Sequence, residues 1–478
     1  MKIIRIFFQW LVFILFLSLS FYTFPKIIVD LILGTQIFPS FFRLILHGFS
    51  AISIILIFNI IFALFLGRFY CSFLCPLGIL QDSIFSIYSF FKKNVKKFRD
   101  KNYYRKTLLI SGGLFFIFLI ASIFNLKVII SIMEPYSLFT KFVYIFDNIL
   151  TDNIKDTFFY FIIILFILFV LKLFFEERFF CKYICPTGFL LRSISNFSLL
   201  NLHIDDNKCI KCKKCENVCK TSCITISKKE NRINNSLCVR CFNCYSECSV
   251  NAISFSVKNG MNIQNLNRRK SLKVLGFSFI LIFFSSLIKK ANFIKNAGKN
   301  FKKNQTVPVG SNTLENYINR CINCNLCVNV CPTNVLQPNI QAPRLNYNIA
   351  FCDYFCNECS KVCPVNAIKY IPIQDKKKIA MGKSNLDKNL CVVYSKNQSC
   401  GACAEICPTG AVHLVNYKNN LMAPELDNKI CVGCGSCEYA CPTRPIRAIK
   451  VEPYNKHRKL KIEEQKTEKE VKTEEFPF

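Results

Sequence analysis

Six groups of four cysteines constrain the fold of this chain more than any other sequence feature. Two of them, CIKCKKCENVC and CVRCFNCYSEC, have the spacing C-x2-C-x2-C-x3-C. Three cysteines two residues apart wrap one face of a cubane, and the fourth reaches the other cluster of the pair. A zinc site would instead use two separate C-x2-C pairs. The runs therefore predict [4Fe-4S] clusters.

The spacing also assigns the ligands of the first two clusters, because the fourth cysteine of each run crosses to the other. Lys220 and Ser249 stand where a proline usually follows the fourth cysteine, which removes no ligand. Cys223 is left over and is interpreted as a packed thiol. The two predicted sets are Cys209, Cys212, Cys215 and Cys248 for one cluster and Cys238, Cys241, Cys244 and Cys219 for the other.

Four more groups follow towards the C-terminus, so that six [4Fe-4S] clusters are predicted in total. Two of these groups have the standard spacing, one opens with three residues between its first two cysteines, and one opens with a loop of eight residues. The sequence leaves open which fourth cysteine serves which cluster. The predicted ligands are Cys321, Cys324, Cys327, Cys331, Cys352, Cys356, Cys359, Cys363, Cys391, Cys400, Cys403, Cys407, Cys431, Cys434, Cys437 and Cys441.

Long apolar segments predict membrane helices ahead of the first cysteine run, since a span takes about 20 residues. The loop 92–106 holds eight Lys or Arg, whereas 126–157 holds three Lys and four acidic residues. The positive-inside rule therefore places the first loop and the N-terminus in the cytoplasm and the second loop outside. The segment Ile27–Leu46 is expected to be re-entrant or interfacial. The four predicted spans are Ile6–Phe24, Gly48–Leu66, Thr107–Asn125 and Phe158–Phe175.

Two near copies of one motif, RFYCSFLCPLG and RFFCKYICPTG, follow the second and fourth spans at a distance of 110 residues. They predict an internal duplication whose C-x3-C-P motifs both emerge on the cytoplasmic face. Residues i and i+4 share one face of a helical turn, so each pair of thiols can point together. A redox role, as an additional cluster or a dithiol, a contact surface for the ferredoxin domain, and plain structure all remain open. The cysteines are Cys71, Cys75, Cys181 and Cys185.

Arg68 and Arg178 open these two motifs. They are expected either to balance negative charge at the cysteines or to anchor helices to lipid headgroups.

The predicted fold is an integral membrane all-α four-helix unit with a fifth anchor helix, Val274–Ile288, and two α+β bacterial-ferredoxin-like domains. Its localisation is the inner (cytoplasmic) membrane, with several passes. The predicted divisions are the membrane unit 1–200, a cytoplasmic two-cluster ferredoxin domain 201–260, the anchor 261–292, a four-cluster polyferredoxin domain 293–454 and a charged, disordered tail 455–478.

Composition excludes other classes of function. The formal net charge is +32, but the basic residues are spread over many loops without a nucleic-acid-binding motif, so no nucleic-acid partner is expected. Juxtamembrane loops facing anionic lipid account for much of this charge. The chain has only four His and lacks C-x-x-C-H, a Ser/His/Asp set and a nucleotide fingerprint. We therefore expect an electron-transfer component rather than a terminal substrate-reducing enzyme.

The arrangement of these motifs resembles a fusion of two known families. The first part, through the paired ferredoxin motif, resembles NapH, a membrane quinol-dehydrogenase component. NRRKSLK and the four later cysteine groups resemble NapG (MauM/NapG-type), a periplasmic polyferredoxin exported by the twin-arginine route. NosR-type proteins share the C-x3-C-P motifs. Arg268, Arg269, Leu272 and Lys273 match the twin-arginine consensus, whereas Ser271 departs from it.

The resemblance implies electron flow from the membrane quinol pool to a periplasmic reductase, of nitrate or nitrous-oxide type, or to its cytochrome. The C-terminal domain is then expected in the periplasm. Glu134 is the predicted acid for quinol proton release, because carboxylates near the membrane interior are usually functional; a solvated loop acid is the alternative. A transmembrane thiol relay and a cofactor-maturation partner, both serving a periplasmic metalloenzyme, are the competing hypotheses. The terminal acceptor and the oligomeric state remain open.

Overall fold

The computed structural model describes residues 2–22, 24–47, 51–91, 103–124, 126–150, 157–227, 231–257 and 305–460. Three predicted features lie outside these residues: the anchor helix, the twin-arginine-like motif and the tail beyond residue 460.

The described residues up to Ser195 are mostly helical, and the order of their helices repeats. Each repeat has a long helix, a bent helix pair, a second long helix, a short turn that carries C-x3-C, and a closing helix with proline at its first position. This order agrees with the predicted duplication. The first repeat comprises α1 (Lys2–Phe21), α2 (Lys26–Gly34), α3 (Ile37–His47), α4 (Ala51–Leu66), α5 (Tyr70–Phe73) and α6 (Pro76–Phe91). The second comprises α7 (Tyr103–Ile123), α8 (Lys127–Met133), α9 (Pro135–Leu150), α10 (Thr157–Phe175), the π-helix η1 (Phe180–Ile184) and α11 (Pro186–Ser195).

The two bent helix pairs differ in how well the sequence predicted them. Helices α2 and α3 meet at 106°, which fits the re-entrant or interfacial segment predicted at Ile27–Leu46. Helices α8 and α9 meet at 88°, although their residues were predicted as an external loop. The segment is therefore helical and not an irregular loop, and its external side stays a prediction. Lys127, Glu134 and Lys141 interrupt the apolar pattern there. All three side chains are buried inside the protein.

One helix of the described residues, α1, is long and apolar enough to cross a membrane, or up to three spans exist if each bent pair counts as one. The other predicted spans coincide with α4, α7 and α10. Their apolar portions, Ser53–Leu66, Lys106–Ser122 and Tyr160–Phe175, are shorter. Membrane anchoring is thus compatible with the structure, and the four-span unit remains a prediction.

Residues 200–257 fold as a small ferredoxin-like module. Strand β1 pairs antiparallel with β4, with Leu202 opposite Phe255, and β2 pairs with β3. A one-turn helix contains the third cysteine of each run. The elements are β1 (Leu200–Ile204), α12 (Lys214–Asn217), β2 (Ile224–Ile226), β3 (Asn231–Ile233), α13 (Asn243–Ser246) and β4 (Ile253–Val257).

Residues 305–460 form the second, longer module, again from one-turn helices and two-stranded sheets. Strand β10 pairs with β7 and stays paired as far as Lys459, opposite Ile379. The boundary predicted at residues 454 and 455 is therefore too early, because the alternating strand continues through the charged residues. The elements are α15 (Leu314–Arg320), α16 (Leu326–Asn329), β5 (Leu336–Gln337), β6 (Arg344–Leu345), α17 (Glu358–Lys361), α18 (Ile373–Lys376), β7 (Ile379–Leu386), α19 (Val392–Lys396), α20 (Ala402–Glu405), β8 (Val412–Asn416), η3 (Lys418–Asn420), β9 (Met422–Leu426), α21 (Ser436–Ala440) and β10 (Ile449–Lys459).

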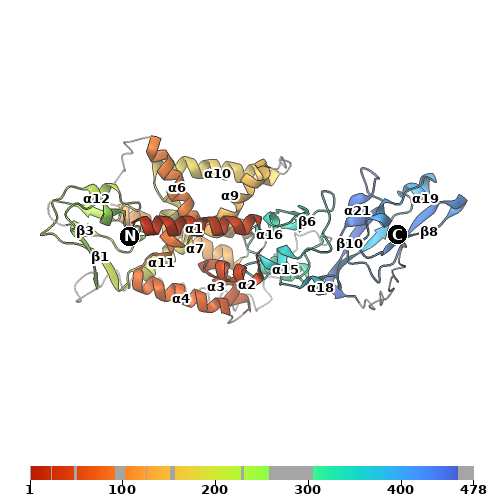
Figure 1. Ribbon diagram of the computed structural model, residues 1–478, viewed down its shortest axis with the longest axis horizontal. Helices are drawn as coiled ribbons and strands as arrows, with labels where there is room; N and C mark the ends of the chain where they lie inside the picture. The colour runs from red at the N-terminus through yellow and green to blue at the C-terminus, as the bar shows by residue number, and fades with distance from the viewer. Residues whose placement is uncertain are drawn as a thin grey trace, which may run out of the picture.

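The protein is elongated, and its two cysteine-rich modules lie at opposite ends of the helical unit (Figure 1). Helices α1, α4 and α10 run along the long axis between them, with the N-terminus beside the first module. One hydrophobic cluster continues from the helices into the second module, joining Phe142 with Tyr317 and Leu326. The first module has its own small core around Leu202 and Ile224.

The end of β10 predicts a pH dependence of stability. Burial lowers the pKa of His457 from 6.5 to about 4, so between these values the unfolded chain binds the proton and the folded chain does not. Stability should therefore fall as pH drops from about 6.5 to 4, by about 3 kcal/mol in all. Hydrogen exchange of β10 and of residues 305–313, compared at pH 7 and pH 4.5, measures this loss.

The matched control is His457→Gln, which cannot titrate. Carboxylates contribute equally to the pH dependence of stability of both proteins. Only the difference between wild type and variant therefore reports on His457. A difference that stays constant across this pH range would contradict the prediction.

Candidate functional site

The first module gathers its cysteines into two hollows. Each hollow takes three cysteines from one run and the fourth from the other run, which is the exchange that the spacing predicts. Among the residues that line the two hollows are Cys238, Cys241, Cys244 and Cys219 in one, and Cys209, Cys212, Cys215 and Cys248 in the other.

The second module shows which fourth cysteine joins which group, a point that the sequence left open. The fourth cysteines are exchanged within two pairs of groups, the first group with the second and the third with the fourth. The sets brought together are Cys352, Cys356, Cys359 and Cys331; Cys391, Cys400, Cys403 and Cys441; Cys321, Cys324, Cys327 and Cys363; and Cys431, Cys434, Cys437 and Cys407.

Backbone geometry fits these sets to cubanes. In every group with standard spacing, the residues on both sides of the second cysteine have positive φ, for example Asn323 and Asn325, or Gly433 and Gly435. This left-handed turn folds three successive cysteines around one centre. Within the described residues, no group of three or more His, Cys, Asp or Glu is close enough to hold a single metal ion. A cubane instead keeps its four thiolates at separate corners, and four thiolates are the usual ligand set of a [4Fe-4S] cluster.

The exchanged ligands predict a specific pattern of iron loss. Cys331→Ala should remove the cluster of the second group, so the double variant with Cys352→Ala should lose no more iron than either single variant, about four atoms. Cys331→Ala with Cys321→Ala should lose about eight, because two clusters are affected. Iron and sulfide analysis of the purified full-length chain tests this. A loss of about four atoms from the second pair would contradict the assignment.

Cys223, predicted as a packed thiol, is buried beside a ligand set. Its Sγ lies 3.4 Å from the Sγ of Cys219, and its backbone N–H donates to the same sulfur at 3.2 Å. Cys223 also lines the hollow that this ligand set forms. Its place in the structure agrees with packing.

The four C-x3-C-P cysteines come together in the helical unit. All four are buried and none forms a disulfide. Cys75 and Cys185 each interact electrostatically with Cys71 and Cys181. Cys185 also interacts with Cys75. The packing of the two repeats therefore joins two pairs of thiols that lie 110 positions apart in the sequence.

The two motif arginines reach across the repeats. Arg68 Nη2 donates to the carbonyl oxygen of Cys181 at 3.3 Å, and Arg178 Nη1 donates to that of Cys71 at 3.2 Å. Their exposed fractions are 1% and 0%. Anchoring to headgroups, one of the two predicted roles, is therefore excluded for both side chains. Both guanidinium groups lie beside the motif cysteines, which is the position that the other predicted role, balancing negative charge there, requires.

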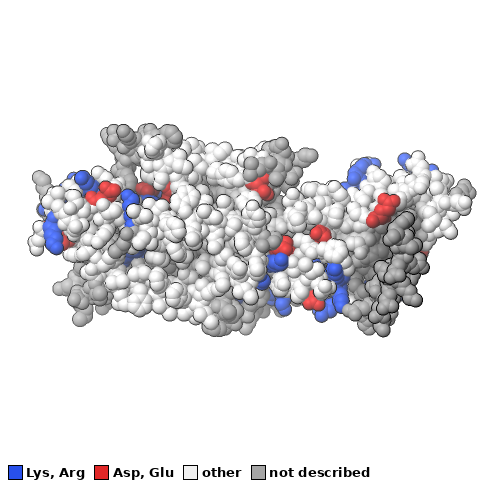
Figure 2. All heavy atoms as spheres, viewed as in Figure 1, with Lys and Arg blue, Asp and Glu red and all other residues white. Residues whose placement is uncertain are grey.

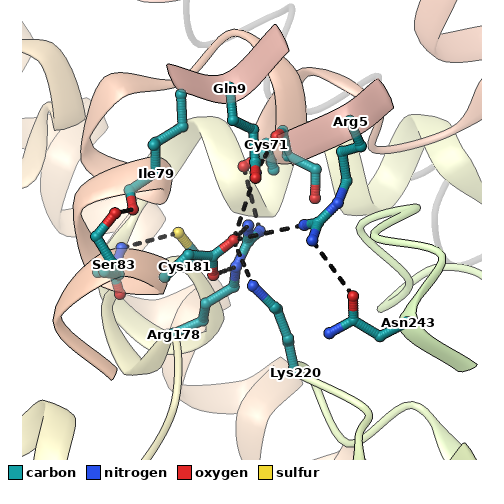
Figure 3. Close-up of polar contacts among 12 residues, drawn as sticks. Arg5, Gln9, Cys71, Ile79, Ser83, Arg178, Cys181, Lys220 and Asn243 are labelled. Carbon is teal, nitrogen blue, oxygen red and sulfur yellow. Dashed lines mark hydrogen bonds and ion pairs between the residues drawn. The ribbon is translucent and has the colours of Figure 1, made fainter. Parts of the chain in front are cut away.

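A buried carboxylate joins the helical unit to the first module. Asp82 accepts from Nε and Nη2 of Arg178, both at 2.6 Å, and pairs with Lys220 at 2.7 Å and Arg5 at 3.8 Å. Figure 3 shows Arg5, Arg178 and Lys220 converging from separate parts of the chain. Burial would raise the pKa of Asp82, but Arg178 and Lys220 hold it well below its usual range. Asp82 is thus the ionised centre of a network that three separate segments share.

Sequence reasoning missed this network. Lys220 was noted only as a departure from the usual proline, and the structure shows that it reaches Asp82. The available signal was one acidic residue, Asp82, in the otherwise apolar segment after the first C-x3-C-P motif.

Glu134, the predicted acid for quinol, lies at the bend between α8 and α9. Its carboxylate accepts from the backbone N–H groups of Tyr136 and Ser137, and its exposed fraction is 1%. It therefore caps the N-terminus of α9 and is not a solvated loop acid. Its role towards quinol stays a prediction.

Comparison with protein families adds to this geometry. Residues 48–97 and 158–204, which contain one C-x3-C-P motif each, match a family described as a 4Fe-4S binding domain. Residues 206–222 match another family with this description. Residues 234–335, and separately 320–367 with 398–445, match families described as 4Fe-4S dicluster domains. The chain is an iron–sulfur electron-transfer protein with several ferredoxin-type domains.

Two curated relatives come from Methanocaldococcus jannaschii. The uncharacterized protein MJ0749 is 29% identical over 160 residues, which cover 34% of this chain and 54% of the relative. The uncharacterized protein MJ0750 is 28% identical over 160 residues, covering 34% of this chain and 61% of the relative. The chain thus spans less than two thirds of the length of either.

Proposed function

We propose that this protein carries electrons across the membrane, from the quinol pool through its [4Fe-4S] sites to a periplasmic reductase or its cytochrome. The observation that carries the proposal is the docking of the two cysteine-rich modules at opposite ends of one helical unit (Figure 1). Each cluster, when bound, accepts and releases one electron. The rest of the chain holds these sites in place and insulates them.

Contacts at one end fix the first module to the helices. Arg240, whose exposed fraction is 1%, donates to the carbonyl oxygens of Leu66 at 2.9 Å and Leu200 at 2.6 Å. On α1, Arg5 donates to Asn243 at 3.3 Å. Together with the Asp82 network, these bonds hold the first module against the C-x3-C-P turns.

Contacts at the other end fix the second module to the two bent pairs. The hydroxyl of Thr140 on α9 donates to the carbonyl oxygen of Cys324, and Asn329 donates to that of Thr140 at 3.3 Å. Lys26, at the start of α2, donates to the carbonyl oxygen of Lys361 at 2.8 Å. The group of Cys321, Cys324 and Cys327 therefore lies directly against the helices.

The outer surface of the helices supports a bilayer between the modules. On the face shown in Figure 2, charged side chains gather towards the two ends, and the central part over α1 and α4 is largely free of them. Large apolar side chains point outward there, including Phe7 and Ile14 on α1 and Phe58 on α4. Lipid chains would cover such a surface.

The proposal has a direct test in two steps. Periplasm-active reporters after residues 257 and 478 should report opposite sides, inside and outside. In vesicles containing the full-length chain, quinol should then reduce an impermeant one-electron acceptor on the side of the second module. Both reporters on the cytoplasmic side would overturn the proposal. Reduction of external disulfides instead of the acceptor would favour the thiol relay.

A further inference from the structure

We propose that Cys71, Cys75, Cys181 and Cys185 together hold one further [4Fe-4S] cluster, between the two modules. This inference deepens the proposed function, because it supplies a site midway along the electron route. Neither repeat has the four thiolates that a cluster needs, so the site exists only when the two repeats pack together.

The local structure around the four thiols fixes their positions. Cys75 and Cys185 stand immediately before Pro76 and Pro186, the first residues of α6 and α11. The Sγ of Cys185 accepts from the backbone N–H of Gly188 at 3.2 Å, and Cys75 makes the same bond with Gly78. The two repeats thus present matching, pre-oriented sulfur atoms.

The glycine of each motif is required by this geometry. A Cβ on Gly78 would lie 2.6 Å from the carbonyl oxygen of Cys71, and one on Gly188 would lie 2.7 Å from that of Cys181. Each closing helix therefore packs against the turn that carries the first cysteine. The sequence pattern C-x3-C-P-x-G is explained by the pair of thiols it brings together.

Buried positive charge calls for a negative group at this site. Arg68 contacts Cys71 Sγ at 3.9 Å, and among the described residues its Nε has no hydrogen-bond partner and no acidic side chain pairs with it. A buried charge is costly unless it is paired. Four neutral thiols would leave Arg68 uncompensated, whereas a cluster with four thiolates carries about −2. A second polar group also faces the site: Gln81 Nε2 donates to Cys181 Sγ at 3.2 Å.

The site lies between the outer cluster sets. On one side, Arg178 interacts electrostatically with both Cys181 and Cys241 of the first module. On the other, Tyr70 interacts with Cys75 and Glu134, and Tyr136 interacts with Glu134 and Cys324. The four thiols thus lie between Cys241 of the first module and Cys324 of the second.

The chemistry at this site is a one-electron exchange. The electron arrives from a [4Fe-4S] site in one module and leaves to one in the other, and no bond to sulfur forms or breaks. A dithiol would instead release two electrons and two protons and form an S–S bond. The two possibilities differ in iron content as well as in redox stoichiometry.

The wild-type chain, purified anaerobically at full length, provides the first test. Seven clusters predict about 28 iron atoms and about 28 sulfides per chain, against about 24 of each for six. About 24 would overturn the inference while leaving the electron route of the proposed function intact. About 26 would replace the four-iron cluster by a two-iron one at the same thiols, and would overturn the cluster type.

Variants locate the additional iron. Cys71→Ser and Cys181→Ser, from different repeats, should each lose about four irons, and the double variant should lose no more. The remaining irons and their spectra show that both modules have folded. Unchanged iron in the single variants, or a disulfide between these cysteines found by mass spectrometry of the denatured wild type, would overturn the site. Arg68→Gln serves as a second probe, and should shift the midpoint potential of this cluster downward without removing it.

Discussion

Replacing Asp82 by asparagine is expected to destabilise the junction between the first module and the helices by about 3–5 kcal/mol. The substitution removes the one negative charge that Arg178, Lys220 and Arg5 share in a buried position. Desolvation of these cations is then no longer compensated, which costs more than the loss of the hydrogen bonds alone. Amide hydrogen exchange in residues 201–257 should accelerate by about 150- to 4000-fold.

Asp30 is the matched control for this prediction. It also pairs with two cations, Lys26 at 2.9 Å and Arg43 at 3.0 Å, but 26% of its side chain is exposed. Asp30→Asn should therefore cost no more than about 1 kcal/mol. Equal effects of the two substitutions would show that burial does not set the strength of the Asp82 network.

A second large effect is expected for Gly435→Ala. Gly435 has a φ of +82°, and a Cβ there would lie 2.2 Å from a ring atom of Tyr347. Tyr347 is itself fixed by a hydrogen bond of 2.8 Å from its hydroxyl to the carbonyl oxygen of Gly433. The clash prevents the turn that brings Cys434 and Cys437 together. The variant should lose about four irons and the spectrum of one cluster.

Gly410→Ala separates backbone strain from this clash. Gly410 has a φ of +66°, and no described atom lies within 4 Å of a Cβ built there. Only the left-handed conformation is then penalised, at about 1–2 kcal/mol, and the iron content should stay at the wild-type value. Loss of a cluster in both variants would show that the left-handed φ alone, and not Tyr347, requires glycine.

The cysteine pattern was readable from the sequence because cluster ligands are close together along the chain. Even the exchange of Cys219 and Cys248 between clusters followed from spacing. Sequence reasoning did not find the helices of residues 126–150, where Lys127, Glu134 and Lys141 made a bent helix pair look like a loop. Hydropathy counts charges without their surroundings, and here the second module covers those side chains.

By itself, the sequence determined the ligand runs, the exchange of the fourth cysteines in the first module and the 110-residue duplication. Each of these depends on residues within a few positions of one another, or on a direct repeat. Only the tertiary structure decided that the four C-x3-C-P thiols meet, that Arg68 and Arg178 cross between the repeats, and that Asp82 binds Lys220. These contacts join residues about 100 or more positions apart, and their energies come from burial, which exists only once the repeats have packed.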